Sequence, residues 1–181
     1  MDNQELLQLD QQQLTQLLVL FKNSPQQKKQ DLIKQLAVTT AQLELLVLGL
    51  KHMGLLLKTS PQGYQLLHKI EQTDINKLKQ KLTQAGIDKP VNYCLSTPST
   101  NKLASTNKQA AIYLSEHQST GKGRKGRHWL TPLGQSIALS VSHNFQFGLK
   151  HLSGLNIAMA VAITNTASHF GYNHLQLKWP N

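Results

Sequence analysis

Three short amphipathic segments follow one another in the first third of the chain, and they limit what this part can fold into. Asp10 and Gln13 form a capping-box pattern ahead of a helix that ends near Asn23. Ser24 is a suitable N-cap for a second helix, with Pro25 at its first position. The predicted buried faces consist of Leu14, Leu17, Leu18 and Phe21 in the first helix and Leu32, Ile33 and Leu36 in the second.

A third helix and a hairpin are predicted next. Thr39 and Gln42 repeat the capping-box pattern, and Gly54 can adopt the left-handed conformation that commonly ends a helix. Two short apolar runs then flank the polar turn Thr59–Gly63, which is typical of a β-hairpin. Three short helices followed by such a hairpin predict a winged helix-turn-helix domain, which we assign to residues 1–68.

The pattern changes in the second half of the chain. Residues 69–88 are expected to form a connecting helix, capped by Asp74, and a linker. Beyond them we predict strands and one long helix, with strands at residues 91–95, 109–115, 136–141 and 175–179 and the helix at 149–170. We therefore predict an α+β protein, in which residues 89–181 form an incomplete mixed α/β domain.

The net charge of +10 is unevenly spread. Residues 1–88 hold ten lysines against eight acidic residues, a balance of +2, whereas residues 89–181 hold nine lysines and arginines against Glu116 alone, a balance of +8. Such a field attracts phosphates, nucleic acid or an acidic protein. The alternative is that the balancing acidic residues lie in further sequence.

Composition also suggests a location. The chain has no apolar run of about 18 residues and no basic-then-apolar leader. Its lone cysteine, Cys94, cannot close an intramolecular disulfide, which fits a reducing compartment. We expect a cytoplasmic protein without a membrane partner.

The most informative segment runs from Gln118 to Trp129. It satisfies the dinucleotide fingerprint G-x-G-x-x-G, but that motif is meaningful only where a helix follows at once, and His128–Pro132 does not begin one. What remains is a loop whose glycines let backbone N–H groups approach an anion and whose cations can neutralise it. These residues are Gly121, Gly123 and Gly126, with Lys122, Arg124, Lys125 and Arg127. The alternative is a basic loop that only touches nucleic acid.

The pattern Gln-x-x-Gly-(Arg/Lys)-Gly-Arg-x-Gly-Arg-x-Trp at Gln118–Trp129 resembles the signature loop of the biotin-protein ligases. Ser99–Asn101 upstream and Lys178–Asn181 downstream are similar to two further motifs of that family, in the same order. The chain is identified as a member of the family of bifunctional biotin-protein ligases and biotin-operon repressors. That resemblance implies a catalytic domain of the class II aminoacyl-tRNA synthetase and biotin ligase type.

The resemblance implies a two-step reaction. Biotin and ATP with Mg²⁺ give biotinyl-adenylate, whose activated carbonyl then passes to a lysine of the biotin carboxyl carrier protein of acetyl-CoA carboxylase. ATP, biotin and Mg²⁺ are thus expected as substrates and cofactor, with no resident metal or prosthetic group. Operator DNA and a second copy of the chain are further candidate partners.

The resemblance also implies roles for individual residues. The biotin-binding set is Ser99, Thr100, Asn101, Gln118, Lys122, Gly123 and Arg124. The adenylate and phosphate loop adds Gly121, Lys125, Gly126, Arg127 and Trp129, and the vicinity of nucleotide and metal adds Lys178 and Asn181. A buried polar ring needs its donors and acceptors matched, which suits the first set. Two alternatives stay open, namely a helix N-cap at Ser99–Asn101 and core packing for Trp129.

Two departures from the family pattern matter. Lys122 stands where arginine is common, which keeps the charge but loses the planar guanidinium fork. The family's essential lysine follows the Lys-Trp-Pro-Asn motif, and nothing follows Asn181 in this chain. No catalytic residue is therefore assigned, and we expect the chain as given not to biotinylate a carrier protein.

The third helix supplies the candidate DNA-contacting residues Thr39, Thr40 and Gln42. A recognition helix normally presents Arg, Lys, Asn or Gln to base edges and phosphates. Here an acidic residue and two leucines occupy faces that should be exposed to water, namely Glu44, Leu45 and Leu48. These side chains suit a contact with another protein at least as well as a DNA groove, so both alternatives stay open.

Two other functions compete with the ligase hypothesis. A non-catalytic regulator that binds DNA would sense biotin through a remnant ligase domain and would release no pyrophosphate. A lipoate or octanoate transferase of related architecture is disfavoured, because the glycine-arginine loop is more typical of biotin ligases.

Overall fold

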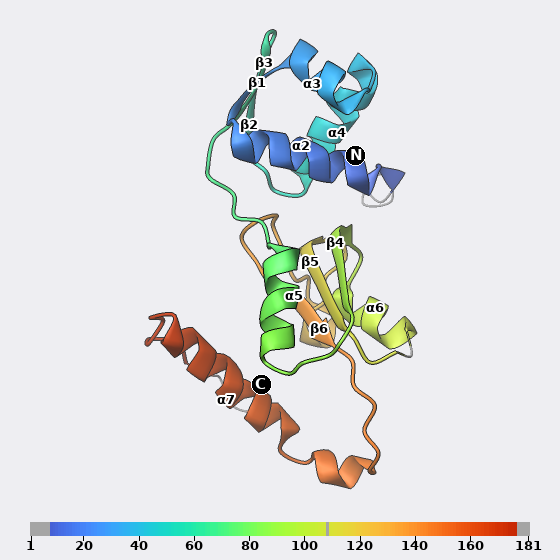
Figure 1. Cartoon of the computed structure of the whole chain (residues 1–181), viewed down its shortest axis with the longest axis vertical. Helices are drawn as coiled ribbons and strands as arrows, with labels where there is room; N and C mark the ends of the chain where they lie inside the picture. Colours follow the sequence, from blue (N-terminus) through green and yellow to red (C-terminus); the bar gives the residue numbers. More distant parts are fainter. Residues whose placement is uncertain (1–7, 108, 177–181) are drawn as a thin grey trace. The chain divides into compact units, whose positions relative to one another are not determined.

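The computed structural model describes residues 8–107 and 109–176, apart from the side chains of Arg124 and Leu149. The chain divides into two compact units, Met1–His143 and Asn144–Asn181. The helices of the first unit are α2 (Gln11–Asn23), α3 (Lys29–Leu36), α4 (Thr40–His52), α5 (Ile75–Gln84) and α6 (Thr100–Thr106) (Figure 1). Its strands are β1 (Gln26–Lys28), β2 (Leu57–Ser60), β3 (Gly63–Leu66), β4 (Val91–Thr97), β5 (Ile112–Gln118) and β6 (Ala138–Val141).

The predicted first and third helices are confirmed, with Asp10 as the N-cap of the first and Thr39 in a full capping box at the third. A carboxylate oxygen of Asp10 accepts hydrogen bonds from the backbone N–H groups of Gln12 and Gln13 at the start of α2. At the start of α4, Thr39 and Gln42 form the reciprocal capping box. Each cap satisfies N–H groups that have no partner inside the helix.

The prediction for the start of the second helix is wrong. α3 begins at Lys29 rather than at Pro25, because Gln26–Lys28 are extended and form β1. β1 pairs antiparallel with β3, with Gln26 opposite Gln65. This pairing reaches across some forty residues, so no local pattern could indicate it.

The predicted hairpin is confirmed as β2 and β3, which pair antiparallel in a sheet of order β1-β3-β2. Gly63 of β3 lies opposite Lys28 of β1. A Cβ atom at this position would lie 2.0 Å from the carbonyl oxygen of Gln27, a distance that no side chain tolerates. The glycine therefore permits the pairing that displaces the start of α3.

One hydrophobic core holds these helices and strands together. Leu14 and Phe21 of α2, Leu32 of α3 and Leu43 of α4 have no exposed surface. Leu133, which lies beyond the predicted N-terminal domain, belongs to the same cluster of buried residues. The apolar periodicity of the sequence thus identified the buried faces of α2 and α3, except that Ile33 is only partly buried.

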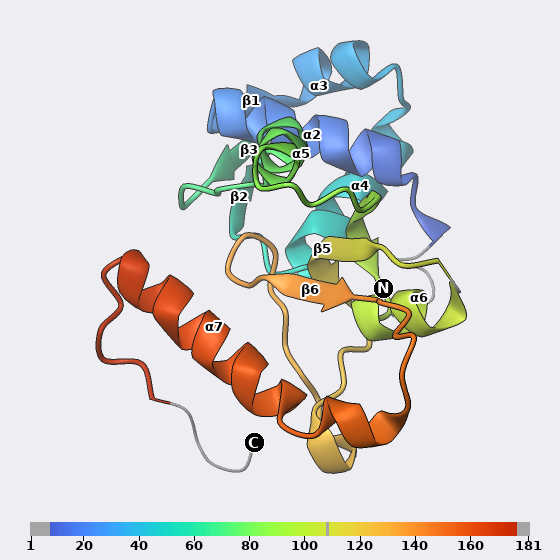
Figure 2. The same ribbon diagram turned by 60° about the horizontal axis from the view of Figure 1, so that its bottom comes forward.

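The second sheet of this unit has the order β4-β5-β6, with β4 and β5 parallel and β5 and β6 antiparallel. The mixed α/β character predicted for this region is confirmed. α6 contacts both β5 and β6 (Figure 2). The strand predicted at 109–115 lies three residues later, because β5 continues until Gln118 is opposite Thr97 of β4.

In the second unit, the helix predicted at 149–170 is interrupted. A short 3₁₀ helix, η2 (Leu149–Leu152), is followed by α7 (Leu155–His169), and Gly154 between them has a left-handed φ of 90°. Leu175 and Gln176 are not in a strand, and the rest of the strand predicted at 175–179 lies outside the described residues. No single helix in the described part of the chain is long and apolar enough to cross a membrane.

Candidate ligand-binding site

The ends of β4 and β5 bring the predicted polar residues together. Thr97 and Gln118 are paired across these two parallel strands, and α6 begins three residues after Thr97. Ser99 is the N-cap of α6, and its hydroxyl accepts a hydrogen bond from the backbone N–H of Lys102 at 3.4 Å. The N-cap alternative for Ser99 is therefore confirmed, and it places Thr100 in the first turn of the helix, next to Gln118.

Gln118 is the centre of a hydrogen-bonded cluster. Its Oε1 accepts from the backbone N–H of Thr100 at 2.8 Å and from the Thr100 hydroxyl at 3.2 Å. Its Nε2 donates to the hydroxyl oxygen of Thr131 at 3.3 Å. The amide is thus held between α6 and the segment that follows the basic loop, in one fixed orientation.

Ser140 of β6 extends the cluster to Asn101. Its hydroxyl donates to Oδ1 of Asn101 at 2.6 Å and contacts the hydroxyl oxygen of Thr100 at 2.9 Å. The sequence analysis missed both Ser140 and Thr131, since nothing in their local sequence marks them. Only the antiparallel pairing of β6 with β5 brings Ser140 to this place.

The residues Gly121–Trp129, here called the basic loop, close on themselves. The N–H of Trp129 donates to the carbonyl of Gly121 at 2.9 Å, and the N–H of Gly123 donates to the carbonyl of Arg127 at 2.7 Å. At the tip lies a short turn, Arg124–Gly126, in which Lys125 and Gly126 have left-handed φ values of 59° and 73°. The loop is therefore a compact hairpin with exposed cations at its end.

Gly121 has a steric reason to be glycine. A Cβ atom there would lie 2.6 Å from the carbonyl oxygen of Trp129 and 3.3 Å from Nε2 of Gln118. The first distance is shorter than any contact that a real side chain makes. Gly121 therefore lets the base of the loop close against the Gln118 amide.

Trp129 is 62% exposed, so the alternative that it packs in a core is wrong. It lies beside a hollow with a volume of about 280 Å³. The residues that line this hollow also include Gln118, Gly121, His128, Leu130 and Thr131, together with His52, Met53 and Gly54 at the end of α4. A polar amide and an aromatic surface thus border the same space, as is usual for small-molecule sites.

His117 borders the same hollow from β5. It is buried, and its Nδ1 lies 2.8 Å from the hydroxyl oxygen of Ser96. Burial lowers the pKa of His117 to about 4, and the nearby His52 adds to the shift. The imidazole is therefore neutral at physiological pH and adds no charge beside Gln118.

Glu116, the single acidic residue after Asp88, makes structural hydrogen bonds to Thr73 and Tyr93. It is buried and accepts hydrogen bonds from the backbone N–H of Thr73 at 2.8 Å and from the Tyr93 hydroxyl at 3.3 Å. Burial raises the pKa of Tyr93, and the neighbouring carboxylate contributes to this rise. Glu116 thus fixes the segment that precedes α5.

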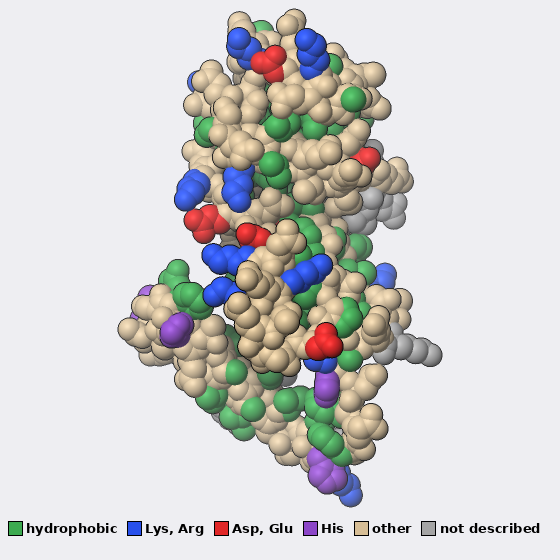
Figure 3. Space-filling view, viewed as in Figure 1, with side chains coloured by type: hydrophobic (Ala, Val, Ile, Leu, Met, Phe, Trp, Pro, Cys, Tyr) green, Lys and Arg blue, Asp and Glu red, His purple; other side chains and the backbone are tan. Residues whose placement is uncertain are grey.

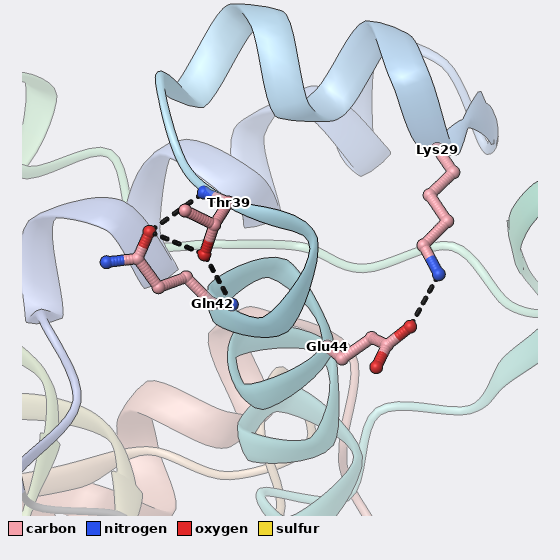
Figure 4. Close-up of polar contacts among 4 residues, drawn as sticks. All are labelled: Lys29, Thr39, Gln42 and Glu44. Carbon is pink, nitrogen blue, oxygen red and sulfur yellow. Dashed lines mark hydrogen bonds and ion pairs between the residues drawn. The ribbon is translucent and has the colours of Figure 1, made fainter.

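The candidate DNA-contacting residues lie at the start of α4 (Figure 4). Oε1 of Gln42 accepts from the backbone N–H and the hydroxyl of Thr39, at 2.8 and 3.0 Å. These two side chains therefore serve the capping box, whereas Thr40 is exposed.

Further along α4, Glu44 accepts a hydrogen bond from Nζ of Lys29 at 2.5 Å (Figure 4). Leu45 and Leu48 are both about half exposed, as expected from the sequence. On the face drawn in Figure 3, Lys and Arg side chains are scattered in small groups and form no single large patch. Both alternatives for this helix, DNA and protein contact, remain compatible with these features.

Several predicted site residues cannot be placed. Lys178 and Asn181 lie outside the described residues, and the side chain of Arg124 is not described. Within residues 8–107 and 109–176, no group of three or more His, Cys, Asp or Glu residues could hold a metal ion.

Comparisons with known proteins point to one family. Residues 92–181 match the model of the biotin/lipoate A/B protein ligase family. The bifunctional ligase/repressor BirA of Salmonella typhimurium is 24% identical over 155 residues, which cover 82% of this chain and 47% of that protein. The protein of the same name from Escherichia coli is 29% identical over 68 residues, or 38% of this chain and 21% of that protein.

A human protein is also similar. The biotin–protein ligase of Homo sapiens is 26% identical over 125 residues, which cover 61% of this chain and 17% of that protein. The chain spans less than half the length of each of these curated relatives.

Proposed function

Because residues 92–181 belong to the biotin/lipoate A/B protein ligase family, we propose that the protein activates biotin and transfers it to a carrier protein. In the first step a carboxylate oxygen of biotin attacks the α-phosphorus of ATP, which gives biotinyl-adenylate and pyrophosphate. In the second step a lysine amine of a biotin carboxyl carrier protein attacks the activated carbonyl, and AMP leaves. The similarity to proteins named as biotin ligases supports biotin as the acyl group.

The observation that carries this proposal is the cluster of Thr100, Asn101 and Gln118 beside the basic loop. The ureido ring of biotin has two N–H donors and one carbonyl acceptor. Amide and hydroxyl side chains can match all three groups, and a matched polar ring enters a pocket without losing hydrogen bonds. The dithiolane ring of lipoate has no N–H or carbonyl group to bond with such side chains, which favours biotin over lipoate.

The basic loop has the chemistry to hold the phosphate of the intermediate. Lys122, Lys125 and Arg127 are exposed at or near its tip, and glycines keep its backbone close to the Gln118 amide. Cations beside a phosphate form strong, charge-assisted hydrogen bonds. A loop that closes over a mixed anhydride also excludes the water that would hydrolyse it. Mg²⁺, which enters with ATP, is assigned no ligand among the described residues and no step.

A second, regulatory function has its own supporting observation. α3 and α4 meet at 98° across a short turn, and helices of a helix-turn-helix motif cross at about 90–120°. The hairpin β2–β3 follows α4, as it does in a winged helix. We therefore retain the division into a winged helix-turn-helix domain at 1–68, a connection at 69–88 and a ligase region at 89–181. Repression of a biotin operon, dimer formation and a cytoplasmic location are parts of the same proposal.

Biotin-dependent exchange of labelled pyrophosphate into ATP tests the ligase function. The protein expressed from its complete gene should catalyse this exchange with biotin and not with lipoate, and it should then label a carrier domain. Biotin binding without exchange would instead indicate a non-catalytic biotin sensor. Exchange with lipoate or octanoate alone would indicate an acyl transferase of the related kind.

A further inference from the structure

We propose that Ser140 is a positioning residue that orients Thr100 and Asn101, two of the residues proposed to bind biotin, for a cyclic urea. This inference rests on the proposed function, since it assigns Ser140 a role in recognising the ureido ring of biotin. Ser140 belongs to none of the sequence motifs of the site. It lies on β6, opposite Tyr113 of β5, and is 8% exposed.

The hydrogen bonds around Ser140 run in one direction. The single hydrogen of the Ser140 hydroxyl is shared between Oδ1 of Asn101 at 2.6 Å, the shorter contact, and Oγ1 of Thr100 at 2.9 Å. Because the Thr100 oxygen accepts from Ser140, the Thr100 hydrogen is directed to Oε1 of Gln118. The Gln118 amide nitrogen then donates to Thr131. Each group therefore has a defined role as donor or acceptor before any ligand enters.

This order matters most for Asn101. An asparagine amide can rotate by half a turn and exchange its oxygen and nitrogen at little steric cost. An amide oxygen can only accept, so a hydroxyl donor in front of it fixes which end is which. With Oδ1 facing Ser140, the Nδ2 hydrogens of Asn101 lie on the other side of the amide. They are then donors suited to the carbonyl oxygen of a cyclic urea.

Removing the Ser140 hydroxyl would leave this arrangement undefined. Asn101 is exposed to solvent, so its amide would sample both orientations, and one of them presents oxygen to the urea carbonyl. Repulsion between the two oxygens would weaken biotin binding. Groups that contact ATP should keep their positions, because the Ser140 hydroxyl bonds to Thr100 and Asn101, which are assigned to biotin.

The test compares four variants of the protein expressed from its complete gene. S140A removes the hydroxyl, S140C keeps a side chain of similar size with a weak donor, and S140T restores a hydroxyl. S142A is the matched control, since the Ser142 hydroxyl lies two residues further along and bonds to the Gln109 carbonyl at 2.7 Å. Calorimetry measures the Kd for biotin, and pyrophosphate exchange measures the KM for biotin and for ATP separately.

We expect the Kd and the KM for biotin to rise about 10-fold in S140A and S140C, the size of one good hydrogen bond. S140T and S142A should stay within about twofold of wild type, and the KM for ATP should not change in any variant. Desthiobiotin, which keeps the ureido ring, should follow biotin across the series.

Other outcomes separate the two proposals. If S140A binds biotin with the same Kd as the wild-type protein, the role of Ser140 is overturned and the ligase function still stands. An equal rise in the KM values for biotin and ATP, with a lowered Tm, would show a general structural role and would also overturn it. A wild-type protein that binds no biotin would overturn the proposed function itself.

Discussion

Gln118 and Thr100 are joined by two hydrogen bonds, in which the backbone N–H and the hydroxyl of Thr100 both donate to Oε1 of Gln118. The side chain of Gln118 thereby accepts a hydrogen bond from one of the N–H groups at the start of α6, which have no partner within the helix. A residue proposed to bind the ligand thus also fixes the helix that carries Thr100 and Asn101. Gln118 is consequently both a pocket residue and a structural one.

Gln118→Met should disturb both roles. Methionine has a similar length but cannot accept from Thr100, so we expect a loss of about 1–3 kcal/mol of unfolding free energy and a loss of biotin binding of at least about 10-fold. Urea unfolding and calorimetry measure the two effects. Gln109→Met, at an exposed position before β5, is the matched control and should change neither. A Gln118→Met protein with wild-type stability would show that the α6 hydrogen bonds contribute nothing.

Gly121→Ala should open the base of the basic loop. The added Cβ would lie 2.6 Å from the Trp129 carbonyl, so the hydrogen bond between Trp129 and Gly121 must lengthen or break. We expect amide hydrogen exchange to accelerate at Trp129 and biotin affinity to fall. Gly148→Ala is the control, because its Cβ would meet nothing within 4 Å. Unchanged exchange at Trp129 in the Gly121 variant would contradict this geometry.

Arg124→Ala should reduce formation or retention of the adenylate far more than it disturbs folding. Under the proposed function this cation bonds to phosphate and contributes directly to the reaction, whereas a cation on a loop contributes little to a core. Biotin-dependent pyrophosphate exchange should fall by about 10-fold or more, with a Tm close to that of wild type. Lys79→Ala, at an exposed position of α5, is the control. Wild-type exchange in the Arg124 variant would remove the assignment.

The protein should lose stability in mild acid because of His117. The pKa of its buried imidazole is lowered from 6.5 to about 4, so the folded state favours the neutral form. The free energy of unfolding should therefore decrease by up to about 3 kcal/mol as the pH falls from 6.5 toward 4. In this range the unfolded chain binds a proton at His117 that the folded protein does not bind.

Urea unfolding of a His117→Asn variant at several pH values checks this prediction. Asparagine does not titrate, so the dependence of unfolding free energy on pH between 6.5 and 4 should become shallower. His174→Asn, at an exposed position, should retain the wild-type dependence. An unchanged slope in the His117 variant would mean that other groups cause the loss in acid.

The helix α4 should bind DNA weakly and with a strong dependence on salt, since few of its side chains can read bases. Glu44→Gln would release Lys29 from its ion pair and remove a negative charge from the surface. We expect DNA affinity to rise several-fold at low salt, with a steeper salt dependence, in a fluorescence anisotropy titration. The control is Glu71→Gln, in an exposed pair with Lys69. Nanomolar, sequence-selective binding by the unaltered protein would contradict the prediction of weak binding.

The start of the second helix illustrates the limit of local reasoning. Ser24 and Pro25 are suitable start signals, yet α3 begins at Lys29 because residues 26–28 pair with β3. Gly63 permits that pairing, but its sequence neighbours indicate only a turn. Here the pairing with a distant strand satisfies the backbone groups of residues 26–28 and overrides the local helix signal.

The sequence by itself determined the helices with strong caps, their buried faces, the hairpin and the residues of the basic loop. These features depend on neighbours within four residues, through side-chain caps, apolar periodicity and the backbone freedom of glycine. Only the tertiary structure decided that Thr131 and Ser140 hold Gln118 and Asn101, and that His117 is buried and neutral. Those properties arise from the pairing of β6 with β5 and from the position of the segment after the loop. They depend on residues that are distant in the sequence, whose side chains carry no local signal of the partners they meet.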